Sequence, residues 1–377
     1  MRKTIPDKRN SALSSGVFTL VLLLTQAPAH AEDIISFSGF MSIVGGQVLN
    51  GSNNTPLNDN ECPCFISDWN HLATYGKNFG VAQESRAGVR MNAKMTESLN
   101  GIVQVDARGT KGSSGATLEW AYIAYEPADD WTLQLGRKRL PIYYYSDFMD
   151  VGFAYPWVRA PQDLYGWEVN NFNGVTVVKT GHMQSWNSRT SFFYGREDSR
   201  ANVLANYFYP GMNVDLVWRD ILGADLELSH DWLTVRFVYI ESRVDISSPV
   251  AGPVVNGAKQ HIYGVSANND YSNWLLRSEF SVFDPWDDMG YRSNAGMLGV
   301  GYHVGDYTPM LTYSRFRDAN SYGSPNWESD TTAITLRYDV NPTSAIKVQY
   351  DRFRELSSTN STTGNANILS MSFDKTF

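Results

Sequence analysis

The chain has 377 residues, a formal net charge of −8 and two cysteines, and 13% of its residues are aromatic. An acidic balance argues against a nucleic-acid partner, and two cysteines are too few for the usual set of zinc ligands. The mean hydropathy is below zero despite the many aromatic residues, which fits a chain whose apolar and polar side chains alternate.

The first residues have the features of a secretory signal. Basic residues lead the chain (Arg2, Lys3, Lys8 and Arg9), an apolar core follows over 17–24, and Ala29-His30-Ala31 carries the small residues that signal peptidase reads. The apolar core is too short for a transmembrane helix. We expect cleavage after Ala31, so that 1–31 is the signal peptide and 32–377 the mature domain. A soluble protein with an apolar N-terminus is the alternative.

The mature chain reads as a series of strands with almost no helical periodicity. Ile334, Leu336 and Tyr338 alternate with Thr335 and Arg337, the period-two pattern of a strand between two environments. Segments of this kind number sixteen, and most have the length of a tilted strand that crosses a bilayer. They are 34–48, 84–95, 101–110, 116–126, 130–138, 172–181, 186–196, 217–229, 232–243, 259–269, 273–283, 295–304, 308–317, 331–340, 343–354 and 366–377.

The connections between these segments alternate between short and long. Tight turns are expected near 97–100, 127–130, 181–184, 230–231, 270–272, 305–307 and 341–342, whereas 50–83, 138–171 and 318–330 are long and rich in turn residues. A soluble β-sandwich lacks this rhythm, whereas outer-membrane barrels have short periplasmic turns and long external loops. We therefore predict an all-β, 16-stranded antiparallel transmembrane β-barrel.

Cys62 and Cys64 flank Pro63 in the first long connection. In an oxidising compartment the pair would form a local disulfide or mark a feature of the loop. We expect neither a metal site nor a cofactor.

Several cations of the early strands are predicted to face the interior of the barrel. In the segment 84–95, Val89 and Met91 share one parity, and Arg86, Arg90 and Lys94 share the other. A cation on the lipid side at mid-depth costs about 2–4 kcal/mol, so the cationic face must line the lumen. Arg108 on the next strand is expected to join it. These charges could also serve only to hydrate the wall.

The C-terminal strand resembles the assembly signal of outer-membrane proteins. Leu369, Met371, Phe373 and Phe377 share one parity, and Phe377 is the last residue, although Lys375 departs from the pattern. The resemblance implies that the barrel-assembly machinery handles the chain during biogenesis.

Over the whole mature chain, the sequence resembles the general porins of Gram-negative bacteria. The most family-like stretch is Leu135-Gly136-Arg137 with the following segment 141–147. The resemblance implies a third loop that folds inward and narrows the lumen, with Arg137 joining Arg86, Arg90, Lys94 and Arg108 on the wall. Asp147 and Asp150 would face them from the loop. Strict alternation points Lys138 inward in place of Arg137, unless Gly136 introduces a bulge.

The resemblance implies a homotrimeric channel of the outer membrane, surrounded by outer-membrane lipid and lipopolysaccharide, through which small hydrophilic solutes and ions diffuse passively. A substrate-specific channel for anions or sugars is the alternative. A barrel enzyme is a third hypothesis, but the histidines show no clustering in the sequence, so we expect no catalytic residues. A transporter with 22 strands and a plug would need a longer chain.

Overall fold

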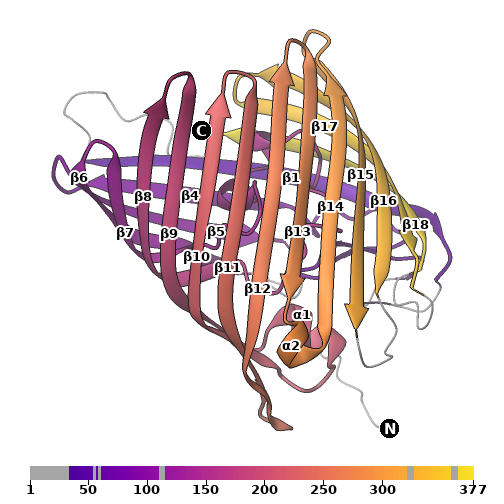
Figure 1. The fold of residues 1–377 in the computed structure, drawn as a ribbon. Coiled ribbons are helices and arrows are strands. Elements are labelled where there is room, and N and C mark those ends of the chain that lie inside the picture. The colour runs from indigo at the N-terminus through magenta and orange to yellow at the C-terminus, as the bar shows by residue number, and fades with distance from the viewer. Residues whose placement is uncertain (1–33, 54–56, 58–60, 110–114, 321–326, 358–363) are drawn as a thin grey trace, which may run out of the picture. The chain divides into compact units, whose positions relative to one another are not determined.

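The computed structural model describes residues 34–53, 57, 61–109, 115–320, 327–357 and 364–377. From Ile35 onward the chain forms one compact unit, built around a closed antiparallel barrel (Figure 1). The expected signal peptide lies outside the described residues. No helix in the described part has the length and apolar character needed to cross a membrane.

Sixteen strands close the barrel in the order β1-β18-β17 and onward down to β4, which pairs with β1, and this confirms the predicted fold class. They are β1 (Ile35–Gly51), β4 (Arg86–Lys94), β5 (Leu99–Arg108), β6 (Ala116–Ala128), β7 (Trp131–Arg139), β8 (Asn171–Met183), β9 (Trp186–Ser199), β10 (Asp215–His230), β11 (Leu233–Ser248), β12 (Gly252–Tyr271), β13 (Trp274–Asp284), β14 (Tyr291–Tyr302), β15 (Tyr307–Asn320), β16 (Glu328–Asn341), β17 (Ser344–Glu355) and β18 (Ala366–Thr376).

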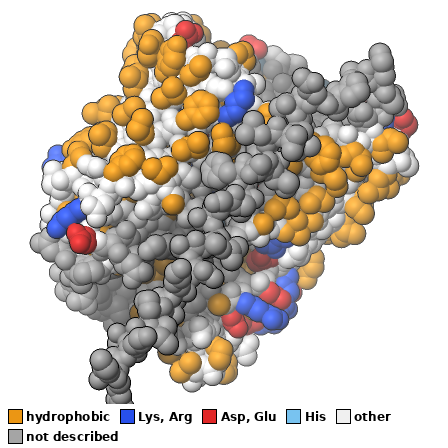
Figure 2. Space-filling model, turned by 180° about the vertical axis from the view of Figure 1, so that it is seen from behind, with side chains coloured by type: hydrophobic (Ala, Val, Ile, Leu, Met, Phe, Trp, Pro, Cys, Tyr) orange, Lys and Arg blue, Asp and Glu red, His pale blue; other side chains and the backbone are white. Residues whose placement is uncertain are grey.

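The strands alternate between lipid-facing and interior side chains because successive residues of a pleated strand point to opposite faces. On β16, Ile334 is 58% exposed and Leu336 45%, whereas Thr335 between them is 1% exposed. The outward row is apolar on strand after strand, and Figure 2 shows the resulting broad patches of hydrophobic side chains on the outer surface. An outward apolar band of this kind is typical of barrels whose outer face lies in a membrane.

Seven tight turns join the strands at one end of the barrel, as expected from the sequence. Several of them place a residue in the left-handed region, such as Gln184 (φ 58°), Asp231 (φ 42°) and Ser272 (φ 55°). Residues with positive φ are favoured in two-residue hairpin loops because such turns match the right-handed twist of the paired strands. We call this end of the barrel the turn end, and the opposite end the loop end.

The two terminal strands close the ring. Gly39 of β1 and the last residue, Phe377, exchange both backbone hydrogen bonds, at 2.8 and 3.0 Å. A Cβ at Gly39 would overlap with the ring of Phe377. Glycine therefore makes room for the terminal aromatic ring at the closure.

Two parts of the loop end differ from the prediction. The region 244–258 was expected to be a long connection, but β11 and β12 continue through it and leave only 249–251 between them. The first connection, expected to be external loop, contains a hairpin of β2 (Phe65–Asp68) and β3 (Ala73–Tyr75) that is not part of the barrel sheet. Phe65 and Tyr75 are fully buried against interior residues of β17 and β18, so this hairpin lies inside the ring.

The remaining elements are short helices in the connections. They are α1 (Val203–Phe208), α2 (Trp286–Met289), η2 (Ser146–Phe148) and η3 (Gly152–Ala154).

Candidate functional site

The third loop, residues 140–170 between β7 and β8, lies inside the barrel. Together with interior residues of the strands, its aromatic residues form the largest buried hydrophobic cluster among the described residues. Trp157 Nε1 donates to Thr312 Oγ1 of β15 at 2.8 Å, and the Tyr165 hydroxyl donates to Glu279 of β13 at 2.5 Å. The loop therefore crosses from the β7 side of the lumen to the wall that faces it.

One carboxylate anchors the middle of this loop to the wall. The two oxygens of Asp150 pair with Arg108 of β5 and with Arg139 of β7, and all three side chains are almost fully buried. Arg86 of β4 donates from Nε to the backbone oxygen of Asp150 at 2.7 Å. Arg86 and Arg108, predicted on the wall, therefore do meet Asp150, predicted on the loop. Their contact is closed to solvent and fixes the position of the loop.

A second anchor holds the distal part of the loop. Arg159 binds Glu84 at 2.7 Å and Asp351 of β17 at 2.6 Å, and it donates to Ser370 of β18. Lys347 of β17 donates to the backbone oxygens of residues 152 and 157 at 2.5 and 2.8 Å. Because each charge is compensated, these interactions can be buried without a large desolvation cost, and they give the loop one defined position.

Three charged side chains in this region stay partly accessible to solvent: Asp147 of η2, Arg90 and Lys138. The half-buried Asp147 carboxylate lies close enough to Arg90 of β4 and Lys138 of β7 to interact electrostatically with both. The guanidinium of Arg90 lies 4.0 Å from the ring centroid of Trp120 and donates to Gln104 at 2.9 Å. Among the described residues, Arg90, Lys138 and Asp147 form no ion pair within 4 Å.

A small cavity continues this group along the wall. Lys138, Asp147, Arg189, Asp225 and Arg236 are among the residues that line it. Asp225 of β10 pairs with Arg189 of β9 at 3.2 Å and with Arg236 of β11 at 3.4 Å. We call Arg90, Lys138, Arg189, Asp147 and Asp225 the lumen charge cluster. Cations and carboxylates within a water-filled, narrowed passage create a focused field that acts on any passing ion.

Two residues expected on the wall lie apart from both groups. Lys94 is the last residue of β4, at the turn end, where its ammonium lies 3.3 Å from Glu97. Arg137 pairs with Glu197 of β9 at 2.8 Å and donates to the backbone oxygen of Leu118. Gly136 causes no shift in the pairing of β7 with β8, and Lys138 is the residue near Asp147, as strict alternation indicates.

Sequence reasoning omitted several residues of the site. Arg189 could have been found, because it shares the parity of Ser191 and Phe193 and lies opposite in parity to the exposed Phe192 and Tyr194. Glu84 and Asp351 gave no such signal, because their importance depends on Arg159, which reaches them only through the path of the third loop.

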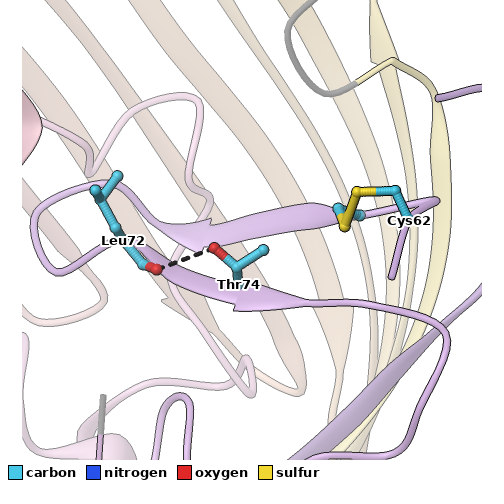
Figure 3. Close-up of a disulfide and its surroundings, with 4 residues drawn as sticks. Cys62, Leu72 and Thr74 are labelled. Atoms are coloured by element: carbon cyan, nitrogen blue, oxygen red, sulfur yellow. Dashed lines mark hydrogen bonds between the residues drawn. A yellow bond between two sulfur atoms is a disulfide. The ribbon is translucent and has the colours of Figure 1, made fainter. Parts of the chain in front are cut away.

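The first connection contains a disulfide between Cys62 and Cys64, beside the inward hairpin (Figure 3). The pair is buried. The sequence left open a local disulfide or a feature of the loop, and the structure has the local disulfide.

Comparisons with known proteins agree with this architecture. A family model described as Gram-negative porin matches residues 19–374, whereas no curated protein matches the sequence. The outer-membrane channel DcaP of Acinetobacter baumannii has a similar structure, with 12% identity, 91% of this chain and 97% of that chain covered, and a TM-score of 0.62. A loop-deletion mutant of OmpT, an outer-membrane protein of Vibrio cholerae, is similar with 13% identity, coverages of 92% and 100%, and a TM-score of 0.59.

An anion-selective porin from Comamonas acidovorans is similar at 11% identity, with coverages of 91% and 97% and a TM-score of 0.57. The Vibrio cholerae OmpT structures include one of a trimer form, at 11% identity and a TM-score of 0.53. At these identities the structures indicate a shared fold.

Proposed function

The chain belongs to the Gram-negative porin family and forms a channel in the outer membrane, and from this premise we propose that small hydrophilic solutes and ions diffuse through it under the control of the lumen charge cluster. The observation that carries this proposal is that Lys138, Asp147, Arg189 and Asp225 line one cavity beside the third loop, with Arg90 within range of an electrostatic interaction with Asp147. No covalent step and no cofactor are needed, because a concentration gradient drives the solute.

We propose a mild preference for anions. In the lumen charge cluster Asp225 is paired with Arg189, which leaves two unpaired cations, Arg90 and Lys138, beside one unpaired carboxylate, Asp147. The formal charge of −8 of the whole chain has little influence here, because exposed charges farther away than about 10 Å are screened at ordinary salt.

Reversal potential in a planar bilayer under a KCl gradient tests this proposal. We expect Arg90→Gln to lower the anion-to-cation permeability ratio about two-fold, and Asp147→Asn to raise it by a similar factor, because each change removes one charge from a focused field. Arg196→Gln is the control, since Arg196 is about half exposed and paired with Asp198 on the outer face. If both lumen variants had the same reversal potential as the parent protein, the lumen charge cluster would not determine the ion selectivity of the channel.

A substrate-specific channel is the second candidate, favoured by the two unpaired cations. The conductance of such a channel for a bound anion would reach a plateau as the anion concentration rises. The conductance of a diffusion pore instead increases in proportion to the concentration. The same bilayer recordings over a range of salt concentrations distinguish the two.

We also propose that the chain has no enzymatic activity. The described histidines contact Asp68, Asn187, Asp231, Tyr239 and Thr308, and none of these pairs includes a serine or cysteine nucleophile. The described residues contain no cluster of His, Cys, Asp or Glu that could hold a metal ion.

We propose that the functional unit is a homotrimer that packs through β4 and β5. These two neighbouring strands contain no aromatic residue, and their outward side chains are aliphatic, such as Ala87, Val89, Met91 and Val105. Elsewhere, bulky outward aromatics such as Trp274 and Tyr302 project into the lipid. A smooth apolar face allows close packing of a second barrel, and the trimer form of the similar Vibrio protein agrees with this proposal.

Further partners follow from the outer-membrane location. On the loop-end half of the outer surface, Arg219, Arg243 and Lys259 are direct neighbours across β10, β11 and β12. Asp245 pairs with Arg219 at 2.5 Å and Asp220 lies 3.7 Å from Arg243, so part of this charge is already compensated. We propose that the phosphates of lipopolysaccharide lie against the exposed cations of the row, Arg243 and Lys259. We propose likewise that a signal peptide over 1–31 directs export, and that the barrel-assembly machinery reads the strand that ends in Phe377.

A further inference from the structure

The hairpin of the first loop extends across the entrance of the barrel. Its base packs on β17 and β18, where the rings of Phe65 and Phe353 meet at 5.6 Å. Its tip reaches α1, in the connection between β9 and β10, which lies half-way round the closed ring from β18. A segment with contacts on opposite sides of a ring must cross the space that the ring encloses.

The base of the hairpin is fixed. Cys62 and Cys64 are linked directly before β2, and the backbone of Lys77 donates to the oxygen of Glu61 at 3.1 Å. Arg159 of the third loop lies over the rings of Phe65 and Tyr75, at 5.7 and 5.6 Å from their centroids. The hairpin therefore rests on the third loop as well as on the wall.

The turn at the tip is also fixed. Asp68 accepts hydrogen bonds from the backbone of Asn70 at 2.9 Å and from the ring of His71 at 2.7 Å. Leu72 has a φ of 50°, and Thr74 Oγ1 donates to its oxygen at 3.0 Å. Figure 3 shows the disulfide at one end of the hairpin and Leu72 at the other, where the chain reverses. These contacts give the residues of the turn a defined direction.

Trp69 is the residue that this turn presents, and it joins three connections that are distant in sequence. Its ring stacks on Phe208 at 6.4 Å, contacts Tyr207 at 5.9 Å and lies edge-on to Trp327 at 4.8 Å. Beneath it lies Gly166 of the third loop, where a Cβ would approach the indole to 2.9 Å. Phe208 is still 46% exposed, so the cluster is open to solvent on one side.

We propose that this hairpin is a second filter, and that Trp69 sets the width of the extracellular entrance above the constriction of the third loop. The proposal rests on the channel function. The indole closes the space between the hairpin tip and the connections before β10 and β16, so a solute has to pass beside this aromatic cluster before it meets the lumen charges. The cluster limits solutes by size, because the rings carry no charge, whereas the lumen charge cluster selects by charge.

Single-channel recording of the full-length protein in KCl tests this role, with neutral polyethylene glycols of graded size as blockers. We expect Trp69→Ala to raise the conductance about two-fold and to admit larger polymers, because removal of the indole widens the entrance. Phe208→Ala should act in the same direction to a smaller extent. Trp286→Ala is the matched control, because Trp286 lies in α2 of another loop and contacts Arg292 of the adjacent strand. The conductance of this variant should equal that of the parent protein.

The outcomes separate this inference from the channel function itself. Current through the parent protein tests the channel, and only the difference between Trp69→Ala and Trp286→Ala tests the filter. Circular dichroism checks that both variants form folded β-barrels. If folded Trp69→Ala and Phe208→Ala both had the conductance and the polymer size limit of the parent, the proposal would be overturned. Should Trp69→Ala fail to fold, Phe208→Ala alone decides, because its exposed ring can be removed with little loss of packing.

Discussion

Asp147 and Asp150 lie three residues apart on the third loop, but their surroundings differ. Asp150 is buried between Arg108 and Arg139 and joins the loop to the wall. Asp147 is half-buried, and in the described structure it has no ion pair although it lies near Arg90 and Lys138. One carboxylate is therefore suited to hold the loop and the other to act on passing ions.

A pair of matched variants separates these roles. Asp150→Asn removes the carboxylate that Arg108 and Arg139 share, although Glu119 still lies 3.0 Å from Arg139 and Asp68 3.8 Å from Arg108. We expect this variant to lower the free energy of unfolding by about 1–3 kcal/mol, the usual cost of leaving a buried donor without its acceptor. Asp147→Asn should change this free energy by less than about 1 kcal/mol. Urea unfolding in detergent micelles measures both, and comparable losses in the two variants would contradict the assignment.

Two neighbouring strands, β4 and β5, differ from most of the barrel in their outer face. Girdle aromatics near the turn end, such as Trp274 with Tyr302 at 4.8 Å and Tyr307 with Tyr338 at 4.8 Å, mark lipid-facing strands, since amphipathic rings favour the membrane interface. Neither β4 nor β5 carries such a residue.

Substitution of one outward residue on this face tests the trimer. A tryptophan is tolerated by lipid but not by a closely packed protein interface, so we expect Val89→Trp to be largely monomeric in mild detergent. Leu276→Trp on β13 adds a ring to an outward position of similar exposure, 36% for both residues, and should remain trimeric. Light scattering coupled to size-exclusion chromatography gives the mass, and a trimeric Val89→Trp would place the interface elsewhere.

The whole barrel is expected to respond to pH through Glu168, near the end of the third loop. Burial raises the pKa of Glu168 to about 7. A carboxyl group whose pKa is higher in the folded state than in the unfolded state binds more protons when folded, so it favours the folded state increasingly as the pH falls from above 7 towards its ordinary value.

We therefore expect the free energy of unfolding to be about 2 kcal/mol larger at pH 5 than at pH 8 on account of this group. In Glu168→Gln that part of the pH dependence should disappear. Urea titrations of both proteins at the two pH values measure the difference, and an equal pH dependence in the variant would refute the role of Glu168.

Much of the barrel could be predicted from the amino-acid sequence because membrane strands obey a local rule. Alternation along β16 or β4 is decided by lipid on one side and water on the other, so each strand carries its own signal. For the same reason Arg86, Arg90 and Arg108 could be assigned to the interior, and Lys138 was the inward residue of β7 that alternation indicated.

The tertiary structure alone decided which interior charges meet. Arg86, Arg90 and Arg108 all point into the barrel. Arg86 and Arg108 are buried against Asp150, whereas Arg90 stays accessible, because the path of the third loop decides which of these arginines it covers. The first-loop hairpin gave no periodic signal of its own, since its two short strands are stabilised by Phe353, by Arg159 and by the rings around Trp69, all distant in sequence. Contacts of that kind arise from the closure of the ring, which brings β18 and the connection after β9 to opposite sides of one lumen.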